Sequence, residues 1–145
     1  MQNLKKTLLI VLAVWLAGIL SSCGSSKETV LSGEERDSVL AYSEAKTDNL
    51  MAGLNAGDYA VFSRDFEQDM LNAMPQSGFE KMKKDRDAKL GSYLSRQVNK
   101  VTLSESGKFV AVIYNAVFEK DAAVSMRVVF RADDPHQVSG LWFNK

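Results

Sequence analysis

The amino-acid sequence predicts an α+β domain, with helices in its first half and a four-stranded antiparallel sheet in its second half. Apolar residues between Glu34 and Leu90 recur at the three- and four-residue spacing of amphipathic helices. After Gly91 the apolar residues alternate with polar ones or form one continuous run, as they do in strands. Helices that precede an antiparallel meander typically pack on one side of the sheet.

The first helix is expected over residues 34–56, which contain no proline. Gly53 should weaken this helix by up to ~1 kcal/mol relative to alanine. Gly57 suits the left-handed residue that ends a helix, and Asp58 is then placed to cap the next, shorter helix.

The last helix is predicted to have Ser77 as its N-cap and to end at Gly91. Ser77 and Glu80 have the spacing of a capping box, in which each side chain accepts a hydrogen bond from a backbone amide of the first turn. The charged residues over 81–89 alternate in sign, which favours a solvated helix face over a basic interaction patch. The apolar side chains expected to face the sheet from these helices are Tyr59, Phe62, Phe66, Phe79, Met82 and Leu90.

The run 109–118 is apolar except for Asn115, as expected of a central strand that is covered on both faces. In the following strand, Arg127 and Arg131 alternate with apolar residues, which predicts one buried face and one wet face. The four strands are expected near residues 101–103, 109–118, 124–131 and 138–143. The core between helices and sheet is expected to contain Phe62, Phe66, Ile113, Val128 and Phe130.

The chain begins with a basic start, Lys5 and Lys6, followed by an apolar segment over 8–20. This segment is shorter than the ~20 residues that a membrane-spanning helix needs, and small residues follow it, as in signal peptides. The tetrad LSSC at 20–23 resembles the lipobox of bacterial lipoproteins. That resemblance implies cleavage before Cys23, a diacylglycerol on its thiol with acyl chains such as palmitate, and a protein anchored to a membrane of the bacterial cell envelope, facing outside the cytoplasm.

These boundaries divide the chain into a signal peptide over 1–22, a lipidated cysteine with a flexible tether over 23–33, and one domain over 34–145. Cys23 is the sole cysteine, which excludes an intramolecular disulfide. The whole chain has 18 basic and 18 acidic residues, and loss of the two leader lysines would leave it slightly acidic. That balance argues against a nucleic-acid partner, which requires a basic face.

The order of elements, with the runs LNAGDY at 54–59 and FSRDF at 62–66, resembles the uncharacterised domains of bacterial lipoproteins in the nuclear-transport-factor-two-like, cystatin-like cone superfamily. The run LGSY at 90–93 is similar to the glycine junction between the last helix and the sheet of those domains. The resemblance covers residues 39–143 and implies a curved, cone-like sheet roofed by helices, often with a pocket. The superfamily includes ketosteroid isomerases and small dehydratases as well as binding and dimerisation modules, so the fold alone does not choose a function.

Few residues suggest catalysis. His136 is the sole histidine and follows the turn 133–135, so we expect a solvated turn residue rather than a general base. Together with Asp134 it would supply too few ligands for a closed metal site. No serine has a nucleophile-elbow context, and no glycine-rich phosphate loop occurs. We therefore predict no catalytic residue, no metal and no cofactor.

Two functions stay open. The first is a lipid-anchored, non-enzymatic accessory domain that binds a small apolar ligand, a peptide or another envelope protein through the cone or the sheet. The second is a small isomerase- or dehydratase-type enzyme that uses a cone pocket. Because tyrosine and tryptophan combine apolar faces with one polar group, the ligand contacts expected in such a cone are Tyr59, Phe62, Tyr114 and Trp142.

Three further features of the predicted strands allow more than one interpretation. Asn115 would orient a ligand, pair with backbone at a bulge, or lie exposed. Arg127 and Arg131 would form either an anion-binding surface or a wet face of long side chains. Trp142 and Phe143 point to opposite faces of their strand, so one of them would face solvent or a homodimer partner unless the outer side of the sheet is covered.

Overall fold

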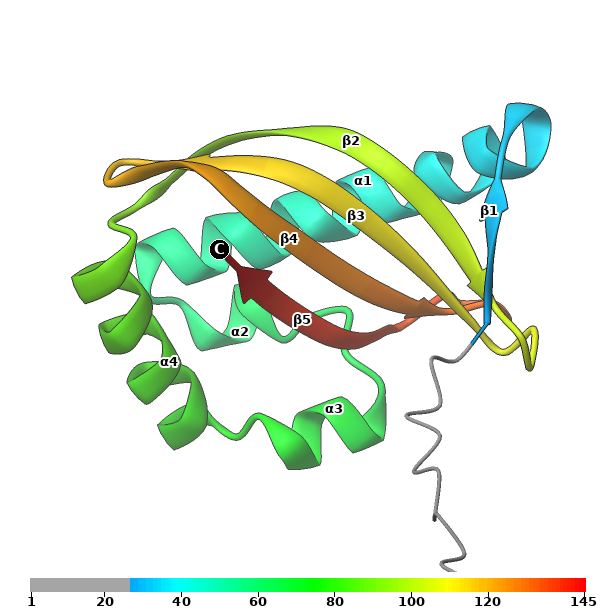
Figure 1. Cartoon of the computed structure of the whole chain (residues 1–145). Coiled ribbons are helices and arrows are strands. Elements are labelled where there is room, and N and C mark those ends of the chain that lie inside the picture. Colours follow the sequence, from blue (N-terminus) through cyan, green and yellow to red (C-terminus); the bar gives the residue numbers. More distant parts are fainter. Residues whose placement is uncertain (1–26) are drawn as a thin grey trace, which may run out of the picture.

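The computed structural model describes residues 27–145. The predicted signal peptide and Cys23 lie outside these residues. The α+β class, with helices before the long strands, is confirmed, and all helices lie on one side of an arched sheet (Figure 1). The elements are β1 (Glu28–Leu31), α1 (Gly33–Ala56), α2 (Tyr59–Phe62), α3 (Gln68–Ala73), α4 (Gln76–Lys89), β2 (Tyr93–Ser104), β3 (Phe109–Phe118), β4 (Asp121–Arg131) and β5 (Val138–Asn144).

The sheet has five strands rather than the four predicted. Their order is β1-β2-β3-β4-β5, each strand is antiparallel to its neighbours, and the sheet does not close. The additional strand, β1, lies within the segment 23–33 that was predicted to be a tether. Its four residues are mostly exposed, so the sequence shows no buried alternation there. Backbone pairing with β2 holds β1, as in the pair of Val30 with Thr102, and the Thr102 hydroxyl donates to Glu28 at 2.9 Å.

The junction between α1 and α2 follows the sequence prediction and adds a packing constraint. Gly57 ends α1 with a φ of 72°, and the Asp58 carboxylate accepts a hydrogen bond from the Val61 amide at 3.1 Å. Gly53 lies buried where α2 crosses α1, and a Cβ there would be 2.3 Å from the backbone nitrogen of Phe62. The glycine is therefore required for the close approach of two backbones, beyond its cost in helix propensity.

The predicted N-cap of the last helix is wrong by two residues, and the capping box is absent. Helix α4 begins at Gln76 with Pro75 as its N-cap, and no side chain caps its first turn. Pro75 already sets the extended geometry at the helix entrance, so Ser77 falls inside the helix, where its backbone is helical. The Glu80 carboxylate instead accepts from the Gln76 side chain at 3.1 Å. Beyond the helix, Gly91 has the predicted left-handed backbone, with a φ of 75°.

The hydrophobic core lies between the inner face of the sheet and the helices. Ile113 is buried but does not belong to this core, because its neighbours Val112 and Tyr114 face the helices and it points the other way. The continuous apolar run of β3 conceals which alternate residues face inward. Of the core side chains predicted from the sequence, Phe62, Phe66, Val128 and Phe130 belong to this core.

Long polar side chains cover part of the outer face of the sheet. Arg127 on β4 reaches Glu28 on β1, with its Nη1 atom 3.3 Å from a carboxylate oxygen. This hydrogen-bonded pair lowers the pKa of Glu28. Arg131 is paired with Asp133 at 3.0 Å. Both arginines therefore lie in ion pairs on the outer face of the sheet. Ile113 points to the same face, and it is only 7% exposed although no described helix covers it.

The two aromatic residues at the end of β5 separate as strand geometry requires. Trp142 lies on the outer face, is 50% exposed and covers Gly140, where a Cβ would be 2.1 Å from the indole ring. Phe143 points inward and packs against the core. Asn115 is exposed and accepts a hydrogen bond from the Asn99 side chain at 3.2 Å, so the buried position considered for it is excluded.

Candidate functional site

A pocket of about 460 Å³ opens between α4 and the ends of β4 and β5. Its size is within the range of small-molecule sites, roughly 300–1,000 Å³. Its most buried lining residues are Val124, Arg86 and Leu90, which are 1%, 4% and 6% exposed. The remaining lining residues are Gly78, Met82 and Phe143 and the rim residues Lys81, Asp85, Lys89 and Lys145.

Helix periodicity explains how α4 forms one wall of this pocket. Gly78, Met82, Asp85 and Lys89 follow one another at spacings of four, three and four residues, so they share one face of the helix. The facing wall comes from the inward side chains of the two last strands.

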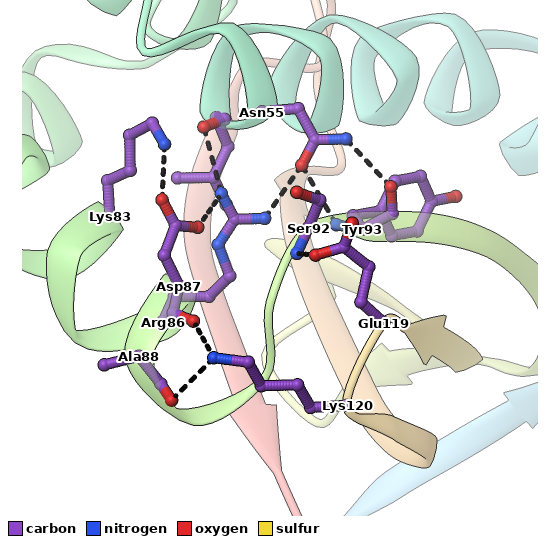
Figure 2. A network of polar contacts seen from close by, with 10 residues as sticks. Asn55, Lys83, Arg86, Asp87, Ala88, Ser92, Tyr93, Glu119 and Lys120 are labelled. Atoms are coloured by element: carbon purple, nitrogen blue, oxygen red, sulfur yellow. Dashed lines mark hydrogen bonds and ion pairs between the residues drawn. The ribbon is translucent and has the colours of Figure 1, made fainter.

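A buried arginine fixes α4 against the end of α1 (Figure 2). Arg86 is 4% exposed, and its guanidinium donates to Asn55 Oδ1 at 2.8 Å and to the carbonyl of Leu54 at 3.1 Å. Asp87 lies 2.7 Å from Nη2 and balances the charge. Burial lowers the pKa of Arg86, and Asp87 opposes that shift. The two Nη atoms thus hold the pocket wall in place, while the buried Nε has no hydrogen-bond partner among the described residues.

The same junction ties the helices to the first long strand. The Asn55 side chain donates to the carbonyl of Tyr93 at 2.8 Å and accepts from its amide at 3.0 Å. Glu119 accepts from the Ser92 amide at 2.8 Å, and the Lys120 ammonium donates to the carbonyl of Asp87 at 2.9 Å (Figure 2). These bonds fix the end of α4 relative to the sheet, so the pocket is preformed.

Two of the predicted ligand contacts, Tyr59 and Phe62, come together around Phe79. The Tyr59 ring centroid is 5.6 Å from that of Phe79, and its hydroxyl donates to the carbonyl of Met74 at 2.8 Å. Phe62 lies 4.7 Å from Phe79 and is 1% exposed. Neither side chain lines the pocket.

The other two predicted contacts, Tyr114 and Trp142, lie on opposite faces of the sheet. Tyr114 is fully buried, and its hydroxyl donates to Glu44 Oε1 at 2.7 Å. Burial raises the pKa of Tyr114, so the phenol remains protonated at neutral pH. Arg96 lies 5.1 Å above its ring and pairs with Glu44, which fastens α1 to the sheet. Neither residue lines the pocket, and Trp142 is on the outer face.

The residues that do line the pocket have ordinary apolar patterns in the sequence. Met82 and Leu90 were recognised as the buried side of a helix, and Val124 as the buried side of a strand. In the sequence, a side chain against a pocket and one against another core residue follow the same periodicity. Side chains that line the pocket differ from core side chains only because α4 is separated from the ends of β4 and β5.

His136 is not the solvated turn residue that the sequence suggested. Its ring is half-buried and stacks on Tyr42, with the centroids 3.8 Å apart and the planes 8° from parallel. Lys46 donates to the carbonyl of His136 at 3.0 Å. The turn therefore packs against α1, a contact between distant segments that local sequence does not reveal.

We expect His136→Ala to lower the free energy of unfolding by ~1 kcal/mol, because the aromatic stack with Tyr42 is lost. His136→Phe, which keeps a flat ring at this position, should retain most of the stability. Urea denaturation followed by circular dichroism measures both. Equal unfolding midpoints for the alanine variant and the wild type would show that the stack contributes nothing.

Within residues 27–145, no cluster of three or more histidine, cysteine, aspartate or glutamate side chains is arranged to hold a metal ion. None of the helices in this part of the chain is long and apolar enough to span a membrane.

The fold and pocket define a small α+β domain with its helices on one side of an open antiparallel sheet. The chain belongs to the DUF3887 family, described as proteins of unknown function, which matches residues 47–141. The match runs from within α1 to within β5 and so includes most of the pocket. No curated protein and no solved structure matches the chain.

Proposed function

We propose that this protein is a lipid-anchored, extracytoplasmic binding domain without enzymatic activity. Its ligand enters the pocket between α4 and the ends of β4 and β5. The observation that carries this proposal is the apolar interior of the pocket, formed by Met82, Leu90, Val124 and Phe143. A preformed apolar pocket with polar groups at its rim is the usual form of a small-molecule site.

The lining of the pocket favours binding over the isomerase or dehydratase alternative. Among the described residues that line it there is no histidine, cysteine, serine or tyrosine. Its one carboxylate, Asp85, lies on the exposed side of α4. Arg86 is held by Asn55 and Leu54 and is not available as a proton donor. Acid–base chemistry needs two groups converging on one reacting centre, and this lining supplies no such pair.

The resemblance to the cone superfamily supports the same proposal. An arched, open sheet with helices on one side is the arrangement that those domains would have (Figure 1). The superfamily includes binding modules and often has a pocket in the cone, whereas the fold by itself does not specify the ligand.

A neutral fluorescent probe, N-phenylnaphthylamine, tests the pocket in the purified protein. We expect its emission to rise on binding, and Met82→Trp to weaken binding about tenfold, or ~1.4 kcal/mol, by filling the pocket. Ala88→Trp adds the same ring to an exposed position of α4 outside the pocket, and should bind as the wild type does. Unchanged binding by a folded Met82→Trp variant would contradict the proposal.

The membrane anchor is tested separately in cells that make the full chain. Cys23→Ala should abolish incorporation of labelled palmitate and release the protein from the membrane fraction, because multiple acyl chains are needed for stable attachment. Ser22→Gly is the control, because it changes the residue before the cleavage site and keeps Cys23. It should retain palmitate incorporation. Palmitate incorporation that persists in Cys23→Ala would contradict lipidation at this residue.

A further inference from the structure

We propose that the ligand of this pocket is an anionic amphiphile with one alkyl chain, whose carboxylate or phosphate group lies between Lys81 and Lys89. This inference rests on the proposed function, because it assigns a ligand class to the same pocket.

The interior of the pocket requires a mostly apolar ligand portion. Leu90, Val124 and the Phe143 ring offer no hydrogen-bonding atom, and Met82 offers only a weak thioether acceptor. Arg86 is the buried polar side chain of the lining, and its Nη atoms donate to Asn55 and Leu54, which leaves Nε as its one atom without a hydrogen-bond partner within residues 27–145. A polar group placed against the apolar side chains would lose its hydration without a partner, which costs roughly 1–3 kcal/mol. The portion of the ligand that contacts Leu90, Val124 and Phe143 is therefore hydrocarbon, and we place the charged head group at the exposed lysines of the rim.

The volume of the pocket favours a ligand with one alkyl chain over a ligand with two. At roughly 30 Å³ for a water-sized group, a pocket of about 460 Å³ has space for about fifteen such groups. That is one alkyl chain of medium length, and each buried methylene contributes ~0.8 kcal/mol. The paired chains of an ordinary membrane phospholipid exceed this space.

The charges at the rim select an anion. Lys81 and Lys89 stand on the same face of α4, four residues on either side of Asp85. Within residues 27–145, neither lysine has an ion-pair partner within 4.0 Å. Lys145, also at the rim, is paired with Asp121 at 3.1 Å. Two ammonium groups beside one carboxylate leave the mouth of the pocket positive.

Other cations of α4 contrast with this pair. Lys83 and Arg86 both share Asp87, on the side of the helix that packs toward α1. Their charges are thus balanced within the fold, whereas Lys81 and Lys89 extend from the pocket edge into solvent. A charge-assisted hydrogen bond from either lysine is available to an acidic head group at the rim.

The test compares four ligands with the same twelve-carbon chain, below their micelle concentrations, by displacement of N-phenylnaphthylamine from the purified protein. Dodecanoate and dodecyl phosphate should bind about tenfold more tightly than dodecanol, and dodecyltrimethylammonium should bind more weakly than dodecanol. Added salt should reduce these differences, because rim charges are screened. Tighter binding of the carboxylate points to a fatty acid, and tighter binding of the phosphate points to a lysophospholipid.

Charge-removing variants locate the effect. Lys81→Gln combined with Lys89→Gln should make dodecanoate and dodecanol bind alike, while Lys84→Gln combined with Lys108→Gln, at exposed positions away from the pocket, should leave the preference intact. Equal binding of dodecanol and both anions by the wild type would overturn this inference and leave the proposed function standing. An anion preference that survives in Lys81→Gln/Lys89→Gln would overturn the head-group position. Failure of all four ligands and of the naphthylamine to bind would overturn both proposals.

Discussion

Phe130→Ala is expected to unfold, or nearly unfold, the domain at room temperature. The Phe130 side chain is fully buried between the sheet and the helices, and its ring meets the Tyr42 ring edge-on with the centroids 5.9 Å apart. Truncation of a buried phenylalanine to alanine costs ~3–5 kcal/mol, because transfer energy is lost and a cavity remains. A small domain has a total stability of only ~5–15 kcal/mol, so the loss is a large part of the total.

Urea and thermal denaturation, followed by far-ultraviolet circular dichroism, measure this effect. Phe109→Ala is the matched control, because Phe109 is only half-buried, on the outer face, with Arg131 5.2 Å above its ring. It should lose far less stability than Phe130→Ala. A melting temperature for Phe130→Ala within a few degrees of the wild type would show that the core is not organised around this residue.

Gly53→Ala is expected to destabilise the domain by ~3 kcal/mol, although helix propensity alone predicts a gain of up to ~1 kcal/mol. The added Cβ would lie 2.3 Å from the nitrogen and 2.7 Å from the Cα of Phe62. These are backbone atoms of α2, so no side-chain rotation relieves the clash, and α2 must move away from α1. That movement would also disturb the buried Phe62 ring.

Gly78→Ala provides a control of opposite sign within the same protein. A Cβ at Gly78 would meet only Met74 and Pro75 side-chain atoms, at 3.5 Å or more, so α4 should gain ~0.5–1 kcal/mol. The two substitutions therefore separate packing from propensity. If Gly53→Ala raised the unfolding midpoint as Gly78→Ala does, the close crossing of α1 and α2 would be wrong.

Elements with strong local signals could be predicted from the sequence. Gly57 and Asp58 mark the end of one helix and the cap of the next through backbone geometry and one hydrogen bond, both of which depend on neighbouring residues alone. The long alternation in β4 likewise fixes which face is buried. In contrast, β1 forms only because a distant strand edge pairs with it. Ile113 was misplaced because an unbroken apolar run has no visible alternation.

The pocket could not be predicted for a related reason. Met82, Leu90 and Val124 carry the same apolar pattern whether another side chain or an open space lies opposite them. The stacking of His136 on Tyr42 depends on where a loop meets a helix 94 positions earlier in the chain. The rim lysines were interpreted as part of a solvated face, which describes their exposure but not their position beside the pocket.

Nuclear magnetic resonance of the labelled protein during titration with N-phenylnaphthylamine tests the proposed pocket most directly. We expect the largest changes in amide and methyl chemical shifts at Met82, Leu90, Val124 and Phe143, which surround the pocket. Ile113, buried on the outer face of the sheet, should shift little. Changes centred on Ile113 and its outer-face neighbours, or no changes at all, would contradict a ligand site between α4 and the ends of β4 and β5.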